Sequence, residues 1–183
     1  LFFYYVQFLD TKLFSRIGFD KSLVEKKNEL KIDENDADAV STYLSCLGKI
    51  PPLETKEEIE LVNHVKAMKK SREIPRIERS AADIRQITIG KKSKDKIMAA
   101  NLRLVVSVAK KFQNQGLFFL ELVEAGISGL EISVDTFDPA MGYKFSSFAY
   151  WWIKSGIINE IDNYKASIPK SNLISLEQRE KLD

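Results

Sequence analysis

The chain has 183 residues, of which 44% are hydrophobic and 30% charged, and its net charge is +2. This length allows one or two domains with their own cores, and the composition is typical of a globular protein. Because the chain has one Cys and one His, Cys46 and His64, it cannot form an internal disulfide or the usual kind of zinc site, and we do not expect these two lone residues to form a catalytic pair. We therefore expect that the protein is not an enzyme and that it binds no cofactor. No apolar run reaches about 18 residues, so no membrane association is expected.

Helical periodicity dominates the chain, and few segments alternate with a period of two, so the expected fold class is all-α. The first half is predicted to contain an apolar helix, a charged linker, a helical region and a polar basic stretch in which Pro75 ends any helix. Three longer helices are predicted after it, and Gly116 is the expected C-cap of the first. In chain order, the predicted helical segments are 1–18, 38–70, 93–115, 119–135 and 146–165.

Two helix starts can be placed by their capping residues. Thr55 is a predicted N-cap, with Glu58 three residues later at the capping-box position. Ser146 is the predicted N-cap of the last helix. The chain starts without a Met and stops abruptly at Asp183, so we expect it to be part of a longer protein.

The segment 142–154 (GYKFSSFAYWWIK) carries aromatic residues interspersed with lysines. A helix starting there would place an aliphatic stripe on one side, formed by Ala149, Ile153, Ile157 and Ile161. The nearly opposite face would carry Phe148, Trp151, Trp152, Ser155 and Asn159. That face is then free to stack on unpaired bases, each stack contributing about 1–3 kcal/mol. The alternative is that Trp151 and Trp152 close a core from two sides.

Charge is unevenly distributed along the chain. Residues 66–96 contain eleven Lys and Arg against four Asp and Glu, whereas from Asn101 onward nine basic residues face ten acidic ones, a net of −1. The basic run is either a solvated linker or a patch that faces phosphates or a polymerase. A protein that binds duplex DNA through its backbone needs clustered cations, so the net charge of the second half argues against simple duplex binding.

Several motifs follow one another in a fixed order in the second half. They are NLRLVVSVAKKF from Asn101, GL from Gly116, FLELVE from Phe119, GLE from Gly129, FDP from Phe137 and GYKFSSFAYWWIK from Gly142. Together they resemble region 2 of the primary-type (housekeeping-like) bacterial sigma factors, especially cyanobacterial and plastid members. Earlier, DAV from Asp38, YL from Tyr43, GKIP from Gly48 and TKEEIEL from Thr55 resemble region 1.2 of that family.

The resemblance implies an all-α fold made of sigma-factor region 1.2 plus the region 2 helical bundle. It divides the chain into an N-terminal helix and charged linker (1–37), region 1.2-like helices (38–70), a basic spacer (71–96), a region 2-like domain (97–169) and the start of a region 3-like segment (170–183). It also implies a non-enzymatic transcription initiation subunit. Such a subunit docks on core RNA polymerase and captures the melted non-template strand of the minus-ten promoter element.

The resemblance assigns DNA-binding roles along the chain. Phe148 would stack under a flipped adenine, Trp151 and Trp152 would wedge at the upstream edge of the bubble, and Ser155 matches a recognition-helix position. Tyr143, Phe145 and Ser147 would line the path of the strand, with Lys144 and Lys154 on phosphates. The residues bordering a pocket for a downstream flipped base would be Leu44, Asn101, Arg103 and Leu104.

The resemblance also predicts a surface that binds RNA polymerase. The helix that follows Gly116 would pack on a coiled coil of the largest polymerase subunit through Phe119, Glu121, Leu122 and Glu124, with Phe118 as a further apolar anchor. The expected location is the bacterial cytoplasm or, alternatively, the plastid stroma.

Relatives carry polar or basic residues where this chain has Ser155, Ile158 and Asn159. The alternative function is therefore a degenerate sigma-like protein that serves as a structural or regulatory subunit without promoter recognition.

Overall fold

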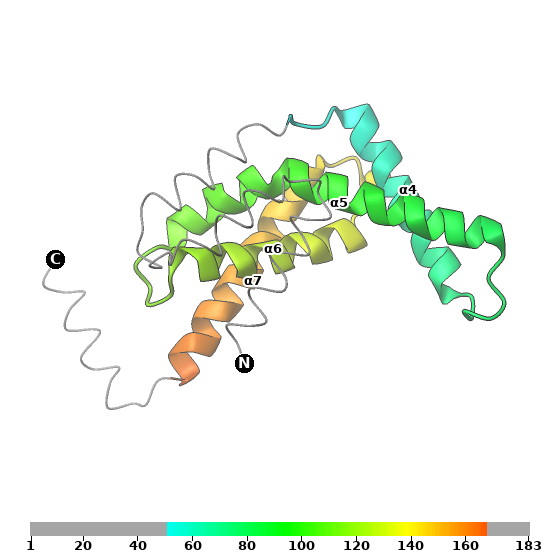
Figure 1. Ribbon diagram of the computed structural model, residues 1–183. Helices are drawn as coiled ribbons and strands as arrows, with labels where there is room; N and C mark the ends of the chain where they lie inside the picture. The colour runs from blue at the N-terminus through cyan, green and yellow to red at the C-terminus, as the bar shows by residue number, and fades with distance from the viewer. Residues whose placement is uncertain (1–50, 168–183) are drawn as a thin grey trace, which may run out of the picture.

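The computed structural model describes residues 51–167, and helices are the only regular secondary structure in this part of the chain (Figure 1). Its α-helices are α4 (Thr55–Glu73), α5 (Ala81–Ala109), α6 (Phe119–Thr136) and α7 (Phe145–Ser167). Two short 3₁₀ helices, Lys110–Phe112 and Pro139–Met141, follow α5 and α6. The predicted all-α fold class is confirmed for this range, which contains no strand. None of its helices combines the length and hydropathy needed to cross a bilayer.

Helices α4 and α5 form a long hairpin whose tip projects away from α6 and α7 (Figure 1). Helix α4 ends at Glu73, shortly before Pro75, as the proline predicted. Ser80 then caps α5: its Oγ accepts from the Asp83 N–H at 3.2 Å, and the Asp83 carboxylate accepts from the Ser80 N–H at 2.9 Å. This reciprocal capping box starts the helix about twelve residues before the predicted start near residue 93. That boundary is wrong, and so is the interpretation of the basic run 66–96 as a solvated linker, because most of the run lies in α4 and α5.

Other predicted helix ends also differ. Helix α5 gives way to a 3₁₀ turn at Lys110, and the chain leaves the helical path at Asn114 (φ 66°) and Gly116 (φ 94°), so Gly116 is not a C-cap. The N-cap of α4 is Glu54, not Thr55, and it makes no side-chain capping bond. Helix α7 includes Phe145, so Ser146 lies inside the first turn and is not its N-cap.

The core runs through all four helices. It contains Val62, Val65 and Met68 from α4, Leu102 and Val105 from α5, Leu122 and Leu130 from α6, and Ile153 and Ile157 from α7, each at most 1% exposed. Burying one such side chain contributes about 1.5–3 kcal/mol. The same core therefore holds the exposed face of α7 in a fixed orientation.

Helices α6 and α7 pack at very short range because glycines line their contact. A Cβ at Gly129 would lie 2.3 Å from the carbonyl oxygen of Trp152, and one at Gly156 would lie 2.6 Å from the carbonyl oxygen of Ala125. Both distances are shorter than any ordinary contact of a Cβ. The absence of a side chain at these positions is what lets the two backbones meet.

Candidate nucleic-acid interface

Helix α7 has one buried and one exposed face, as its sequence predicted. Ala149, Ile153, Ile157 and Ile161 are at most 3% exposed and pack in the core. On the other side Trp151 is 66% exposed and Trp152 36% exposed, and Ser155 and Asn159 are also exposed. The tryptophans therefore do not close a core, and this alternative is excluded.

Aromatic rings connect the exposed face of α7 to the interior. The Phe137 ring is buried, and its centroid lies 5.2 Å from that of Phe145 and 5.4 Å from that of Phe148. Phe148 is half-buried and lies 6.3 Å from the Trp152 ring. We call Phe148, Trp151 and Trp152 the aromatic platform. Because Phe148 rests on a buried ring, its outer part is held in place, and this rigidity favours stacking with a planar ligand.

Phe145 is a correction to the predicted site. It is fully buried, so it cannot line a DNA strand. Position 145 lies four residues before Ala149 and thus continues the aliphatic stripe by one turn. This spacing could have identified Phe145 as a core residue from the sequence alone.

Cations lie beside the exposed rings. Lys154 Nζ is 5.5 Å from the centroid of the Trp151 ring, and Lys111 Nζ is 5.5 Å from that of Tyr150. The Tyr150 and Trp151 rings meet edge to face at 5.7 Å. Each exposed cation–π contact contributes about 0.5–1 kcal/mol. Lys111 was not predicted as a site residue; its only sequence signal was its place in the Lys110-Lys111 pair before the Gly116 turn.

The other predicted strand-lining residues lie at the start of α7. Tyr143 is 67% exposed, and Lys144 and Ser147 are also exposed. They follow Gly142, whose φ of 73° ends the preceding 3₁₀ turn and which has open space around its missing side chain. The left-handed conformation there favours glycine and directs the chain into α7.

The predicted pocket residues on α5 differ in their availability. Arg103 is exposed, whereas Asn101 and Leu104 are half-buried. The Asn101 side-chain nitrogen donates to the Ile97 carbonyl at 2.8 Å, within its own helix. The amide nitrogen is therefore engaged within α5. Leu44, the remaining predicted pocket residue, lies outside the described residues.

The predicted polymerase surface on α6 needs one correction. Leu122 is fully buried and belongs to the core, so it cannot contact a partner. Glu121 accepts from the Phe118 N–H at 2.9 Å and so caps the first turn of α6. Phe119 and Glu124 are half-buried. The exposed apolar side chains on this part of the molecule are Phe118, at 44%, and Ile132, at 46%; Ile132 was not predicted.

Glu58 and Lys66 of α4 support the segment that leads into α7. The Glu58 carboxylate accepts from the Phe145 backbone N–H, and burial raises the pKa of this Glu, an effect that the hydrogen bond partly opposes. Lys66 Nζ pairs with Asp138 at 2.6 Å, and Asp138 also accepts from the Ala140 N–H at 3.0 Å. These two contacts, led by the one from Lys66, lower the pKa of Asp138. Helix α4 thus holds both ends of the segment that leads into the aromatic platform.

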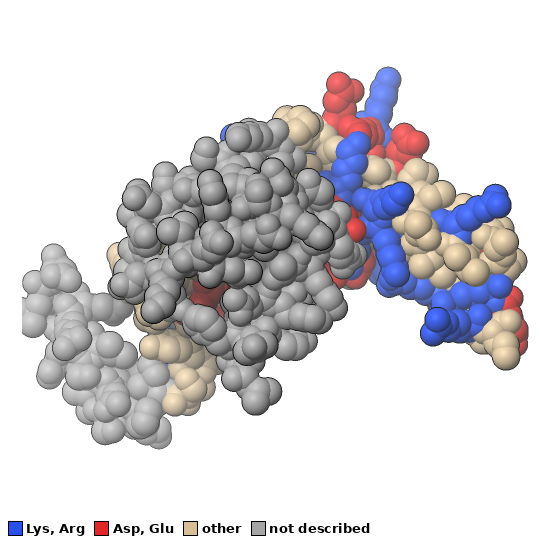
Figure 2. Space-filling view, viewed as in Figure 1, with Lys and Arg blue, Asp and Glu red and all other residues tan. Residues whose placement is uncertain are grey.

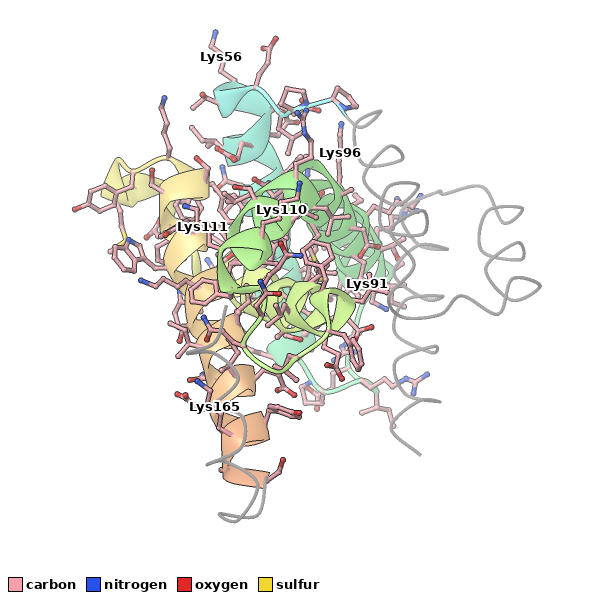
Figure 3. The ribbon with its side chains drawn as sticks, turned by 90° about the vertical axis from the view of Figure 1, so that its left-hand side faces the viewer. Lys56, Lys91, Lys96, Lys110, Lys111 and Lys165 are labelled. Carbon is pink, nitrogen blue, oxygen red and sulfur yellow. The ribbon has the colours of Figure 1, made fainter. Side chains whose placement is uncertain are left out.

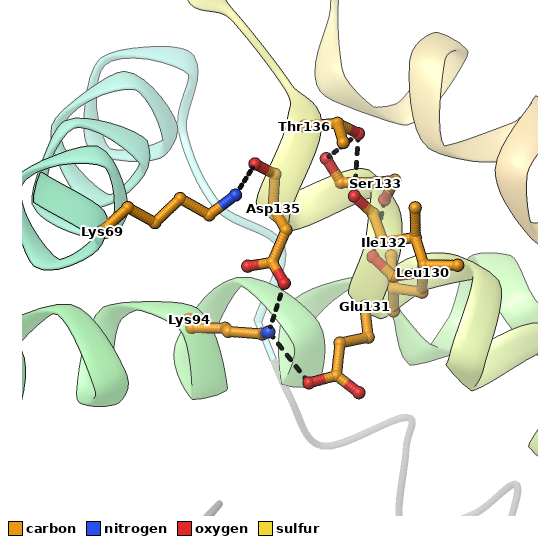
Figure 4. Close-up of polar contacts among 8 residues, drawn as sticks. All are labelled: Lys69, Lys94, Leu130, Glu131, Ile132, Ser133, Asp135 and Thr136. Carbon is orange, nitrogen blue, oxygen red and sulfur yellow. Dashed lines mark hydrogen bonds and ion pairs between the residues drawn. The ribbon is translucent and has the colours of Figure 1, made fainter. Parts of the chain in front are cut away.

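A second group of contacts ties the α4–α5 hairpin to the end of α6 (Figure 4). Lys94 Nζ bridges Glu131 at 2.8 Å and Asp135 at 2.9 Å, and Lys69 donates to the backbone carbonyl of Asp135. Helix α6 has no basic residue in its own last turn. The two lysines supply the positive charge that stabilises a helix C-terminus, so they are internal contacts and not ligand groups.

The described residues contain no cluster of His, Cys, Asp and Glu that could hold a metal ion. The chemistry available at this surface is therefore that of rings and cations. Rings stack on planar groups, and cations neutralise anions. An unpaired nucleic-acid strand offers both planar bases and anionic phosphates.

Comparison with known proteins agrees with this geometry. Residues 97–166 match the family described as Sigma-70 region 2. The chain is 46% identical over 145 residues to RNA polymerase sigma factor SigA4 of Synechococcus elongatus, covering 79% of this chain and 47% of that protein. It is 38% identical over 184 residues to RNA polymerase sigma-B factor of a Nostoc species, covering 86% of this chain and 54% of the relative. The chain thus spans about half the length of these curated relatives.

Proposed function

From the premise that this chain belongs to the sigma-70 family, with its region 2 at residues 97–166, we propose that it is a transcription initiation subunit that captures unpaired promoter DNA. The subunit has no chemistry of its own and acts with core RNA polymerase. The strand it captures is the melted non-template strand of the minus-ten element. The proposed location is the compartment of the polymerase, which is the bacterial cytoplasm or, in the alternative, a plastid stroma.

One observation carries the proposal: the exposed aromatic platform of α7 stands over a fully buried aliphatic stripe. Trp151 and Trp152 are 66% and 36% exposed while Ile153 and Ile157 beside them are fully buried. Large exposed rings on a rigid helix need a ligand or a partner to explain them. Bases flipped out of a duplex supply flat surfaces for such rings, and every base has one.

The cations near the rings support the same ligand. Lys154 and Lys111 each sit 5.5 Å from an aromatic centroid, so a stacked base would bring its phosphate close to an ammonium group. Lys144 and Arg103, both exposed, extend this arrangement to the start of α7 and to α5. In this proposal Tyr143 and Ser147 border the strand, and Asn101, Leu104 and Leu44 border a pocket for a downstream base.

Docking on the polymerase is assigned to α6 and the residues just before it. Phe118 and Ile132 offer exposed apolar surface, and Phe119, Glu121 and Glu124 are partly exposed. An amphipathic helix of this kind fits a helical groove or coiled coil of a partner. The coiled coil of the largest catalytic subunit is the partner that the family membership favours.

The second candidate is a sigma-like subunit without promoter recognition, which the substitutions at Ser155, Ile158 and Asn159 favour. The charge argument for this candidate is weaker than the sequence indicated, because a division at Asn101 cuts through α5 and separates its basic first half from its second half. What distinguishes the candidates is binding of unpaired bases.

A fork-junction DNA with an unpaired adenine, compared with intact duplex of the same sequence, tests the proposal. Assembled with core polymerase, the protein should bind the fork more tightly. Replacing both Trp151 and Trp152 by Ala should abolish this preference, whereas Asn163→Ala, at an exposed position farther along α7, serves as the matched control. Equal binding of fork and duplex by the unsubstituted protein would support the second candidate.

A further inference from the structure

Five exposed cations form one straight row along the outer side of α5. Helical pitch places them within an arc of about 40° over a length of about 38 Å. All five side chains are exposed, and Lys110 continues the row because it keeps a right-handed helical backbone just past the end of α5. We call the following residues the cationic row: Arg85, Lys92, Lys96, Arg103 and Lys110.

The rest of α5 explains why the row is so narrow. The wide opposite side of the helix is buried against its neighbours through Ile97, Leu102, Val105 and Val108, each 0% exposed. Between Arg85 and Lys111 the sequence has eight Lys and Arg and a single acidic residue, Asp95, which is 9% exposed. Apart from Lys94, which pairs with Glu131 and Asp135, these basic residues lie at solvent-exposed positions in α5 and just after it.

The surface around the row is also basic. Figure 2 shows many Lys and Arg side chains over the part of the molecule formed by α4 and α5, together with acidic side chains near the start of α4 and near the tip of the hairpin. One member of the row, Lys96, is paired with Glu57 at 2.5 Å. Both side chains are about half exposed, at 56% and 41%, and an exposed pair of this kind contributes only about 0–1 kcal/mol. A phosphate can replace the Glu57 carboxylate there.

The row ends beside the aromatic platform. Lys110 is followed by Lys111, whose ammonium lies over the Tyr150 ring, and Tyr150 in turn meets Trp151 edge to face at 5.7 Å. Figure 3 labels Lys96, Lys110 and Lys111 and shows Lys110 and Lys111 at the end of α5 that is nearest to α7. An anion that follows the row thus arrives at the rings without leaving basic surface.

We infer that the cationic row is a track for the sugar-phosphate backbone of a single DNA strand that continues from the aromatic platform toward Arg85. This inference rests on the proposed function, since it extends the path of the captured strand. A linear polyanion matches a linear row of cations, and continuity with stacking rings favours an unpaired strand as the occupant. Because Arg103 lies downstream in the proposed path, the track holds the strand on the downstream side.

The test uses forks whose non-template strand extends downstream by a short or a long single-stranded stretch, about 4 or about 16 nucleotides. With core polymerase present, the unsubstituted protein should bind the long fork more tightly than the short one. The combined change Arg85→Glu and Lys92→Glu, far from the platform, should remove this advantage and leave short-fork binding unchanged. The slope of log affinity against log salt for the long fork should fall by about 1.4, because each cation on a single strand contributes about 0.7.

A matched control changes the net charge equally at positions outside the row. Lys91→Glu with Lys165→Glu serves this purpose, and both lysines are exposed (Figure 3). The milder change Arg85→Gln with Lys92→Gln should remove about half of the affinity advantage of the long fork. It shows whether the effect of charge reversal comes from a disturbed α5. Circular dichroism should show unchanged helix content in all three variants.

The outcomes separate the track from the proposed function. If reversal in the row behaves like the control while the tryptophan changes still abolish fork preference, the track is wrong and the proposed function stands. If reversal weakens short fork, long fork and duplex alike, the row is a general electrostatic patch and the track is again wrong. If the unsubstituted protein does not distinguish fork from duplex, the proposed function fails regardless of the row.

Discussion

Gly129 of α6 lies against the backbone carbonyl of Trp152 in α7, so closely that a Cβ at position 129 would stand 2.3 Å from the carbonyl oxygen. The same Cβ would lie 2.9 Å from the Cα of Ile153. Both neighbours are backbone atoms, which cannot turn aside as a side chain can. The helix proposed to dock on the polymerase is therefore in direct backbone contact with the helix that carries the aromatic platform.

Gly129→Ala should push α6 and α7 apart. Overpacking of this kind costs about 1–3 kcal/mol of unfolding free energy, and the shift should also reduce the preference for forked over duplex DNA. Urea denaturation and fork binding measure the two effects. Ser128→Ala, an exposed neighbour on the same helix, is the control and should stay within about 0.5 kcal/mol. Full stability of the Gly129 variant would contradict the described contact.

Phe148→Ala should weaken binding to an unpaired adenine by about 1–3 kcal/mol, because it deletes one stacking surface. Phe148→Tyr keeps the ring and should preserve binding. Fork affinities of both variants with core polymerase measure the difference. Because Phe148 also touches Phe137, the stability of the Ala variant must be measured in parallel. If Ala and Tyr bind the fork equally well, Phe148 is only a packing residue.

Phe118 and Leu122 were both predicted to contact the polymerase, but Phe118 is exposed and Leu122 is buried. Phe118→Ser should reduce association with core polymerase while leaving the unfolding free energy nearly unchanged, since the side chain is 44% exposed. Leu122→Ala should instead cost about 2–5 kcal/mol, as expected for a core leucine. Co-purification with polymerase subunits and chemical denaturation distinguish the effects. Normal polymerase binding by both Phe118→Ser and Ile132→Ser would move the contact off this surface.

Glu58 should make stability depend on pH in an unusual direction. Its folded pKa is raised by burial, so the proton favours the folded state. This contribution is complete below the unfolded pKa of about 4.3 and is lost as the pH rises through the folded pKa. Glu58→Gln retains an oxygen that accepts from the Phe145 N–H but does not titrate.

The comparison to make is unfolding free energy against pH for Glu58→Gln and the unsubstituted protein. The variant should gain relative stability as the pH rises from about 4 toward neutrality. Glu60→Gln, an exposed position on the same helix, is the control and should leave the pH profile as it is. Parallel profiles for Glu58→Gln and the unsubstituted protein would show that the Glu58 carboxyl has the same pKa in both states.

The sequence by itself determined the features that depend on periodicity within one helix. The aliphatic stripe of α7 and the end of α4 before Pro75 follow from the helical pitch and from proline stereochemistry. The family followed from the order of motifs along the chain. These signals are local, so they do not require knowledge of which surfaces meet.

Only the tertiary structure decided which apolar residues are buried and where α5 begins. Leu122 has a side chain suited to an interface, but packing between helices places it in the core. Helix α5 starts at Ala81 because a capping box at Ser80 and the close approach of Gly90 to Met68 extend it along α4. The cationic row aligns only if α5 is one unbroken helix from Ala81, because the helical pitch then fixes the angular position of each residue. The first part of α5 has few apolar residues, so its sequence pattern does not reveal that the helix is continuous.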